Sequence, residues 1–356
     1  MASLAPYMEW AKSRPHAGVD LALSNVLACT VDDLEDAAAA LDLSGTNDNG
    51  YPPLVEAIAG LYGVSTDRVA TAIGTSGANF LAGLALIAPG DHVLVESPAY
   101  DPLLAIPRAL GAHVGRFTRR FEDNFAIDPD AVSRAMTPST RLIIVTQPHN
   151  PSGGMSAETA LVEIARTAER QGAYVLVDEV YLDATSGCGA TPAALFADNI
   201  ITTNSLTKSY GLAPLRCGWV LASDEVAERI RRTRDVVDGT GSIVAERLSA
   251  VAFQQLDRLA ARASAIVEPN VARFRSFLEA TPALQGFVER ATVAFPRLAS
   301  GEDAAPFAEA LLRAHDTAVV PGRFFEAAAH FRIGLGVHPD VLARGLENIR
   351  AALASP

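Results

Sequence analysis

Cysteines and long apolar runs are both scarce in this chain of 356 residues. The three cysteines, Cys29, Cys188 and Cys217, form no CxxC pair, which excludes a disulfide scaffold and favours a reduced, cytoplasmic protein. No apolar run reaches the roughly 18 residues that a membrane span needs. The N-terminal residues also lack the apolar core of a signal peptide. We therefore expect a cytoplasmic protein that has no membrane partner.

Positive charge is also in short supply, because 29 lysines and arginines face 41 aspartates and glutamates. The formal net charge of −12 makes the chain a poor electrostatic match for nucleic acid or for an anionic membrane. The composition, 49% hydrophobic and 20% charged, argues against global disorder. The length of 356 residues favours about two domains.

Lysine is the rarest of the charged residues, since Lys12 and Lys208 are the only two and all other basic residues are arginines. The difference has a chemical meaning, because a guanidinium group stays protonated and cannot form a Schiff base, whereas a desolvated lysine amine can. Lys208 therefore stands out, although a surface position is the ordinary interpretation of any single lysine.

Short β-branched runs alternate with helical stretches between residues 69 and 222. The predicted strands are VATAI (69–73), HVLVE (92–96), HVGRF (113–117), RLIIV (141–145), AYVLV (173–177), NIITT (199–203) and CGWVLA (217–222). This alternation predicts an α/β fold in which helices cover both faces of a mostly parallel sheet. The last strand follows no helix-sized crossover and is predicted to be antiparallel.

The pattern changes beyond residue 224. A helical stretch runs towards residue 279, with a break or kink predicted at Pro269. Short strands and an amphipathic helix near 338–353 follow. We predict a large domain over residues 46–240 and a smaller α+β domain over 241–356, which residues 1–45 join.

Four polar clusters follow predicted strands, where α/β sheets bind ligands. They are GTSGAN (74–79), QPHNPSGG (147–154), VDEVY (177–181) and SLTKSYG (205–211) with Arg216 behind it. The first is either an anion site at a helix N-terminus or a plain turn. The second is a turn rich in proline and glycine, unless Asn150 faces the same crevice. Asp178 ends an apolar strand, so it needs a cation, which could be an internal ion-pair partner.

Taken together, these clusters resemble the class I/II aminotransferases, which are fold type I pyridoxal-phosphate enzymes. The resemblance extends from GYPPLVEAIA (50–59) to FRIGLG (331–336). It implies a large domain with a seven-stranded sheet, a smaller α+β domain and the cofactor pyridoxal 5′-phosphate. It also implies amino-acid and 2-oxo-acid substrates, and a homodimer with its sites at the subunit interface. No metal site is predicted.

The resemblance also implies roles for individual residues. Lys208 would form the internal aldimine and move the proton, while Asp178 would pair with the pyridinium nitrogen. Asn150 and Tyr181 would hydrogen-bond the 3′-oxygen, and Tyr100 would stack on the ring. The predicted phosphate ligands are Thr75, Ser76, Gly77, Ser205 and Arg216. The predicted substrate-binding residues are Arg332, which would clamp the α-carboxylate, together with Asn150 and Asn25. The ordinary alternative for Arg332 is a surface arginine.

The sequence departs from the family pattern at two places. A tyrosine that often reaches the neighbouring subunit's phosphate is replaced by Gly45 or Thr46, with Asn47 and Asn49 nearby. The glycine-rich N-terminal motif reads DLALSNV (20–26), where Ser24 and Asn25 either contact substrate or belong to an ordinary strand. No second carboxylate-binding arginine can be assigned, because Arg234 could equally be helical surface.

Three other functions stay open at this point. The nearest is another reaction on the same fold, such as β-elimination at a C–S bond, racemisation or a step in unusual amino-acid metabolism. A cofactor-binding regulator is more distant, because the N-terminal region is short for the DNA-binding segment that we expect in such regulators, and the chain is acidic. A nicotinamide dehydrogenase lacks GxGxxG and would leave Lys208 and Arg216 without roles.

Overall fold

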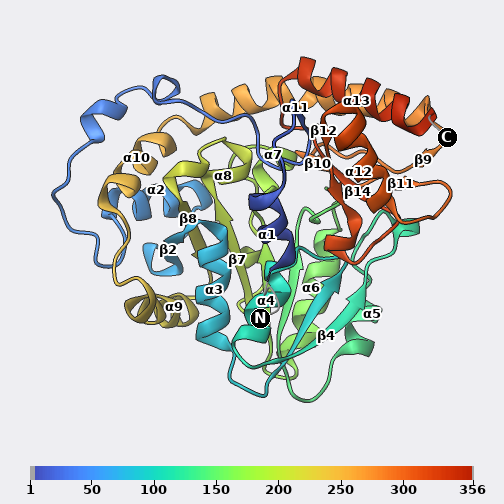
Figure 1. Ribbon diagram of the computed structural model, residues 1–356. Coiled ribbons are helices and arrows are strands. Elements are labelled where there is room, and N and C mark those ends of the chain that lie inside the picture. The colour runs from blue at the N-terminus through green and yellow to red at the C-terminus, as the bar shows by residue number, and fades with distance from the viewer. Residues whose placement is uncertain (1–4, 355–356) are drawn as a thin grey trace.

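A seven-stranded sheet forms the centre of the protein in the computed structural model, which describes residues 5–354 (Figure 1). The strand order is β2-β8-β7-β6-β5-β3-β4. The strands are β2 (Val69–Ile73), β3 (His92–Ser97), β4 (His113–Thr118), β5 (Thr140–Thr146), β6 (Tyr174–Asp178), β7 (Ile200–Ser205) and β8 (Cys217–Leu221). All seven predicted strands are therefore confirmed.

Strand direction also follows the prediction. Strands β4, β3, β5, β6 and β7 pair in parallel, whereas β8 is antiparallel to both of its neighbours, β7 and β2. The only α-helix between β7 and β8 is α8 (Leu206–Ser209), which is too short to carry the chain back along the sheet. The chain therefore reverses direction shortly after Lys208, the lysine that the sequence singles out.

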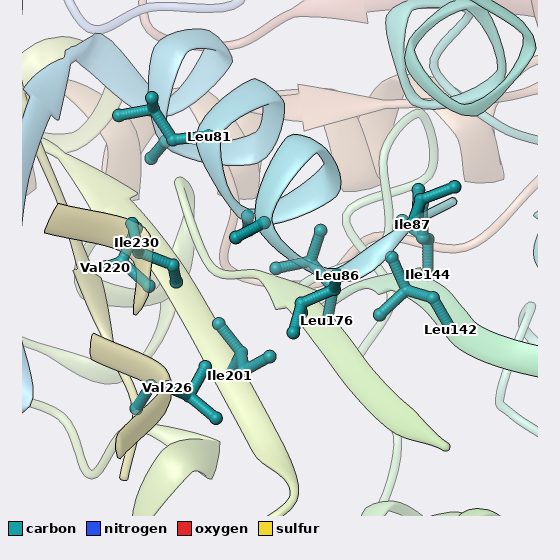
Figure 2. Close-up of a cluster of buried hydrophobic side chains, with 14 of the residues drawn as sticks. Leu81, Leu86, Ile87, Leu142, Ile144, Leu176, Ile201, Val220, Val226 and Ile230 are labelled. Atoms are coloured by element: carbon teal, nitrogen blue, oxygen red, sulfur yellow. The ribbon is translucent and has the colours of Figure 1, made fainter. Parts of the chain in front are cut away.

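Helices cover both faces of the sheet, as the apolar strands require. On β5, Leu142 and Ile144 enter one buried cluster, and the alternating Ile143 and Val145 enter another. Figure 2 shows the first cluster, where side chains of α3 (Gly74–Leu86) and α9 (Asp224–Val237) meet the sheet. The second cluster packs against α5 (Pro129–Ala135) and α6 (Glu158–Glu169). Two further helices, α2 (Pro52–Tyr62) and α4 (Pro102–Ala109), lie beside β2 and β4.

The helical stretch after residue 224 is interrupted at other places than predicted. It forms α9, α10 (Ile243–Phe253) and α11 (Leu256–Glu279), and α11 continues through Pro269. A break at Pro269 is wrong, because a continuous apolar stripe of α11, including Val267 and Val271, packs into one core, whereas a kink there stays a prediction. The interruptions lie instead at 238–242, where Gly239 has a φ of +63°, and at 254–255.

The C-terminal part combines helices with short strands. Its helices are α12 (Ala304–His315) and α13 (Pro339–Ala354), and α13 confirms the amphipathic helix predicted near 338–353. Strands β10 (Val293–Ala294), β14 (Phe331–Gly334) and β13 (Val320–Pro321) form an antiparallel sheet. Strand β9 (Leu284–Gln285) pairs with β11 (Arg297–Leu298). In the described part of the chain, no helix is long and apolar enough to cross a membrane.

The N-terminal segment reaches across the molecule. Strand β1 (Val19–Asp20) pairs in parallel with β12 (Thr317–Ala318), and α1 (Pro6–Ser13) lies in the middle of the view in Figure 1. One buried cluster joins Leu34 and Ala37 to Trp219 of the sheet and to Ala250 of α10. The domain boundaries at residues 45 and 240 stay a prediction.

Candidate active site

A cavity of about 520 Å³ opens where the parallel strands end. Strand ends, the start of α3, helix α1, the loop 22–25 and β14 all contribute to its lining. The cavity brings together most of the site residues predicted from the sequence, namely Asn25, Thr75, Ser76, Tyr100, Asn150, Asp178, Tyr181, Ser205, Lys208, Arg216 and Arg332. Gly77 is the exception, because it lies in the first turn of α3 but not in the lining.

Lys208 projects into this cavity from α8, the short helix directly after β7. The Ser205 hydroxyl caps α8 by accepting a hydrogen bond from the Thr207 backbone N–H. The ε-amine donates to Ser24 Oγ at 2.8 Å and to Asn25 Oδ1 at 2.7 Å. Burial and the nearby Arg332 cation lower the pKa of Lys208 to about 7. A large fraction of the amine is therefore neutral and nucleophilic near neutral pH.

Asp178 ends β6 with a buried carboxylate. It accepts hydrogen bonds from Asn79 Nδ2 at 2.8 Å and from the Val180 backbone N–H at 3.1 Å. Burial raises the pKa of Asp178 to about 6. The alternative of an internal ion pair is not realised, since no lysine, arginine or histidine of residues 5–354 lies within ion-pair distance of Asp178.

Asn79 is a residue that sequence reasoning passed over. It stands in the GTSGAN cluster, one helical turn after Ser76, and is buried against the sheet. Its amide oxygen accepts a hydrogen bond of 2.6 Å from Thr203, which orients the amide nitrogen toward Asp178. The sequence feature that could have indicated a role for Asn79 is a polar side chain one turn after Ser76, where the helix has become apolar.

The start of α3 and the end of the loop before β8 form one end of the cavity. The hydroxyl of Thr75 is buried there without a hydrogen-bond partner. Gly74 has a φ of +68°, and a side chain at this position would collide with the guanidinium of Arg216. Arg216 is exposed and, within residues 5–354, has no acidic partner within ion-pair distance. A helix N-terminus, an unpartnered hydroxyl and a guanidinium without an acidic partner suit a phosphate group.

Arg332 also lines the cavity, with 1% of its surface exposed, so the surface alternative is excluded. It donates to Asn150 Oδ1 at 3.0 Å and to the Tyr7 hydroxyl at 2.6 Å, and both acceptors are neutral. Its Nε has no hydrogen-bond partner. No carboxylate of residues 5–354 pairs with this buried guanidinium. Such a cation is completed by an anionic ligand.

Three tyrosines surround this guanidinium. Tyr7 comes from α1 and meets Tyr100 edge-on, with ring centroids 5.7 Å apart. Burial raises the pKa of Tyr181 to about 12, and the nearby Arg332 cation opposes that shift. The sequence carried no signal for Tyr7, because it lies in an isolated eight-residue helix far from every motif.

These features fit a phosphorylated aldehyde cofactor, with an amine, a buried carboxylate and an anion site in one cavity. The family profile described as "Aminotransferase class I and II" matches residues 19–349. The chain belongs to the class I and II aminotransferase family. Members of this family depend on pyridoxal phosphate, so the predicted cofactor is confirmed, together with the predicted enzyme class.

Individual relatives agree with this family assignment. The chain is 33% identical over 298 residues to a capreomycidine synthase from Streptomyces vinaceus, covering 81% of this chain and 75% of that protein. It is 29% identical to an aspartate/prephenate aminotransferase from Thermus thermophilus, covering 85% and 82% respectively. A crystal structure of a PLP-dependent aminotransferase from Streptococcus suis superposes with a TM-score of 0.91 at 28% identity, covering 98% and 97%. The predicted fold type I architecture is confirmed.

The structure decides the position of two residues of this aminotransferase whose roles the sequence left open, Arg234 and Asn47. Arg234 is neither helical surface nor part of the cavity, since it is buried and lies 3.6 Å from Glu246 and 3.5 Å from Asp238. Asn47 is also buried and donates to Glu246 Oε2 at 2.9 Å. Both residues therefore stabilise the contact between α9, α10 and the chain before α2.

Proposed function

We propose that the protein moves an amino group from an L-amino acid to a 2-oxo acid, with pyridoxal 5′-phosphate held on Lys208. The observation that supports this most directly is the joint position of the Lys208 amine, the Asp178 carboxylate and the unpaired Arg332 guanidinium in one cavity. Each group alone has a structural explanation, but together they match the needs of amino-acid chemistry on a pyridine ring.

The residues around the cofactor ring would each have a separate role. When bound, the cofactor withdraws the electron pair that the substrate's α-carbon keeps after losing its proton. Asp178 would hold the ring nitrogen in its protonated form, and Lys208 Nζ would carry the proton. Asn150 and Tyr181 would face the ring's 3′-oxygen, and Tyr100 would cover the ring.

The phosphate would lie at the start of α3, where Thr75, Ser76 and the backbone at Gly77 come together, with Ser205 and Arg216 as further partners. Arg332 would bind the substrate's α-carboxylate through its planar fork of N–H groups. Its present acceptors, Asn150 and Tyr7, would orient that fork.

A single half-reaction tests the proposal. The cofactor-loaded protein, mixed with an amino acid and no 2-oxo acid, should release one equivalent of the matching 2-oxo acid and then stop. Adding a second 2-oxo acid should restart the reaction. Continuous release of ammonia without any added 2-oxo acid would contradict amino transfer.

A second candidate is another reaction of the same cofactor. The observation that favours it is the 33% identity to a protein named capreomycidine synthase, a name that does not describe amino transfer. β-Elimination, the alternative considered from the sequence, would give pyruvate and ammonia in repeated turnovers. The half-reaction above separates these outcomes.

We also propose that the protein works as a homodimer in the cytoplasm. Large apolar side chains are exposed along the N-terminal segment and beside the phosphate end of the cavity, namely Leu23, Leu27, Val31, Leu41, Leu43 and Ile73. In a homodimer, the partner subunit would cover some of these apolar side chains and remove them from water. All three cysteines are free, as a reducing compartment requires. Light scattering that finds an active monomer at assay concentration would exclude the dimer.

A further inference from the structure

The loop 21–27 passes directly over Lys208, and the rest of the protein holds its backbone in place. Several hydrogen bonds fix this loop, among them Gly334 N–H to Leu21 O at 2.7 Å, Leu27 N–H to Gly336 O at 2.8 Å, Val26 N–H to Lys208 O at 3.0 Å, and Thr292 Oγ1 to Ser24 O at 3.0 Å. The loop is therefore tied both to β14 and to the backbone of the lysine itself.

Two glycines allow the loop to approach this closely. A side chain at Gly334 would collide with the carbonyl oxygen of Leu23, and one at Gly336 would collide with the carbonyl oxygen of Asn25. The backbone of β14 thus serves as a close support on which the loop rests. Because the backbone is fixed at both ends, the side chains of Ser24 and Asn25 start from defined positions.

Both side chains point at one atom. Ser24 Oγ accepts from Lys208 Nζ at 2.8 Å, and Asn25 Oδ1 accepts from the same nitrogen at 2.7 Å. Ser24, Asn25 and Tyr181 all line the same cavity as the amine. A neutral primary amine has two N–H bonds and one lone pair, so two acceptors occupy both hydrogens and leave only the lone pair free.

We infer that Ser24 and Asn25 are positioning residues for Lys208. They hold its ε-amine whenever the amine is not bonded to the cofactor, and they orient the lone pair of the amine for proton transfer. This inference rests on the proposed function. With the cofactor bound, Lys208 Nζ would accept the proton that the substrate's α-carbon loses, and the cofactor would take up the electron pair of the broken C–H bond. Nζ would later give up the same proton, which restores the neutral amine. The loop acts on the amine throughout and need not touch the substrate.

The first test uses the protein without cofactor. Because the chain has two lysines, amine acetylation at a series of pH values, read by peptide mass spectrometry, reports Lys208 with exposed Lys12 as internal reference. In the wild type, Lys208 should react with a midpoint near pH 7. Ser24→Ala with Asn25→Ala removes acceptors that favour the ammonium form, so the midpoint should fall by about one pH unit. Asn25→Asp should raise it by at least about one unit, because a carboxylate then faces the amine.

The second test uses the cofactor-loaded protein and measures solvent deuterium entering the amino acid at its α-carbon. The double alanine variant should exchange about tenfold or more slowly, because the amine is no longer oriented. The amount of covalently bound cofactor and the affinity for an unreactive substrate analogue should stay within twofold. Ser300→Ala, an exposed serine in a distant loop, is the matched control and should change none of these values.

The outcomes separate the two proposals. If the wild type exchanges deuterium but releases no 2-oxo acid, amino transfer is wrong, and the variants still decide the role of the loop. If midpoints and exchange rates match the wild type in the folded variants, the loop does not hold the amine and the inference is wrong. Equal losses of exchange, cofactor binding and thermal stability would show a merely structural loop and would also overturn it.

Discussion

The proposed cofactor side and the proposed substrate side of the cavity are built from different kinds of structure. The cofactor side comprises residues at the strand ends of the central sheet, namely Thr75, Ser76, Asp178, Ser205, Lys208 and Arg216. The substrate side comprises residues of α1 and of the loop behind it, namely Tyr7, Met8, Trp10, Lys12, Ser24 and Asn25. The first is fixed by neighbouring strands, whereas the second depends on one short helix and one loop.

This difference separates chemistry from selectivity. Asp178 and Ser205 are buried and held by the register of β6 and β7, so they present the same groups to any substrate. Trp10 and Lys12 are more exposed on α1, which is held by the Tyr7 N–H on Asp101 and by the packing of Trp10 on Phe324. We therefore expect cofactor-side variants to affect all substrates alike, and α1 variants to affect substrates differently.

The largest effect is expected for Lys208→Ala. Activity should fall by roughly four orders of magnitude for every amino acid, because the nucleophile and the proton carrier are both lost. Borohydride reduction of the wild type followed by peptide mapping should find the pyridoxyl label on Lys208. The variant should still hold cofactor without a covalent bond, and a label on Lys12 would contradict the assignment.

Asp178→Asn should come next, with kcat lower by at least about 100-fold and little change in cofactor affinity. The neutral amide no longer favours a protonated ring nitrogen, while the anion contacts at Thr75, Ser76 and Arg216 survive. Equilibrium dialysis of the cofactor beside a turnover assay measures both quantities. Near-normal turnover would show that Asp178 does not face the ring.

Arg332→Lys tests the boundary between the two sides. Binding of amino acids should weaken roughly 10- to 100-fold, because a lysine cannot reproduce a bidentate, charge-assisted pair. Cofactor absorbance should stay unchanged, and amines that lack a carboxylate should react equally with both proteins. A variant that still prefers amino acids to such amines would place carboxylate recognition elsewhere.

The smallest effect is expected for Trp10→Ala. Changes in kcat/KM of up to about tenfold should differ in size between amino acids with large and small side chains. Cofactor affinity should not move, since Trp10 lies on the substrate side. A competition assay with paired amino acids measures the ratio of their kcat/KM values. An equal loss of kcat/KM for all amino acids would contradict the division between the two sides.

Most of the central sheet could be predicted, because fully buried parallel strands leave a strong local pattern. Runs such as RLIIV have no polar face, and residues 205–217 are too short for a crossover, so both strand positions and the direction of β8 follow. Pro269 could not be judged in the same way. The packing of α11 compensates for the hydrogen bond that proline removes, and packing is not visible in a local pattern.

The residues of the cofactor side were predictable for a related reason. They lie at the ends of strands or next to them, and the ends of parallel strands meet at one edge of a sheet. A resemblance to a known family then suggested their roles. By contrast, nothing near Asn79 indicated that its amide would face Asp178, because the two are 99 residues apart.

By itself, the sequence determined the α/β architecture, the family and the set of residues that the strand ends bring together, because these depend on local periodicity and motif order. Only the tertiary structure decided that Tyr7 meets Arg332 across 325 residues of chain and that Ser24 and Asn25 meet the amine of Lys208. These contacts join segments with no common pattern. They arise where the N-terminal segment is drawn against β14 and the sheet by backbone hydrogen bonds, and no local preference encodes that approach.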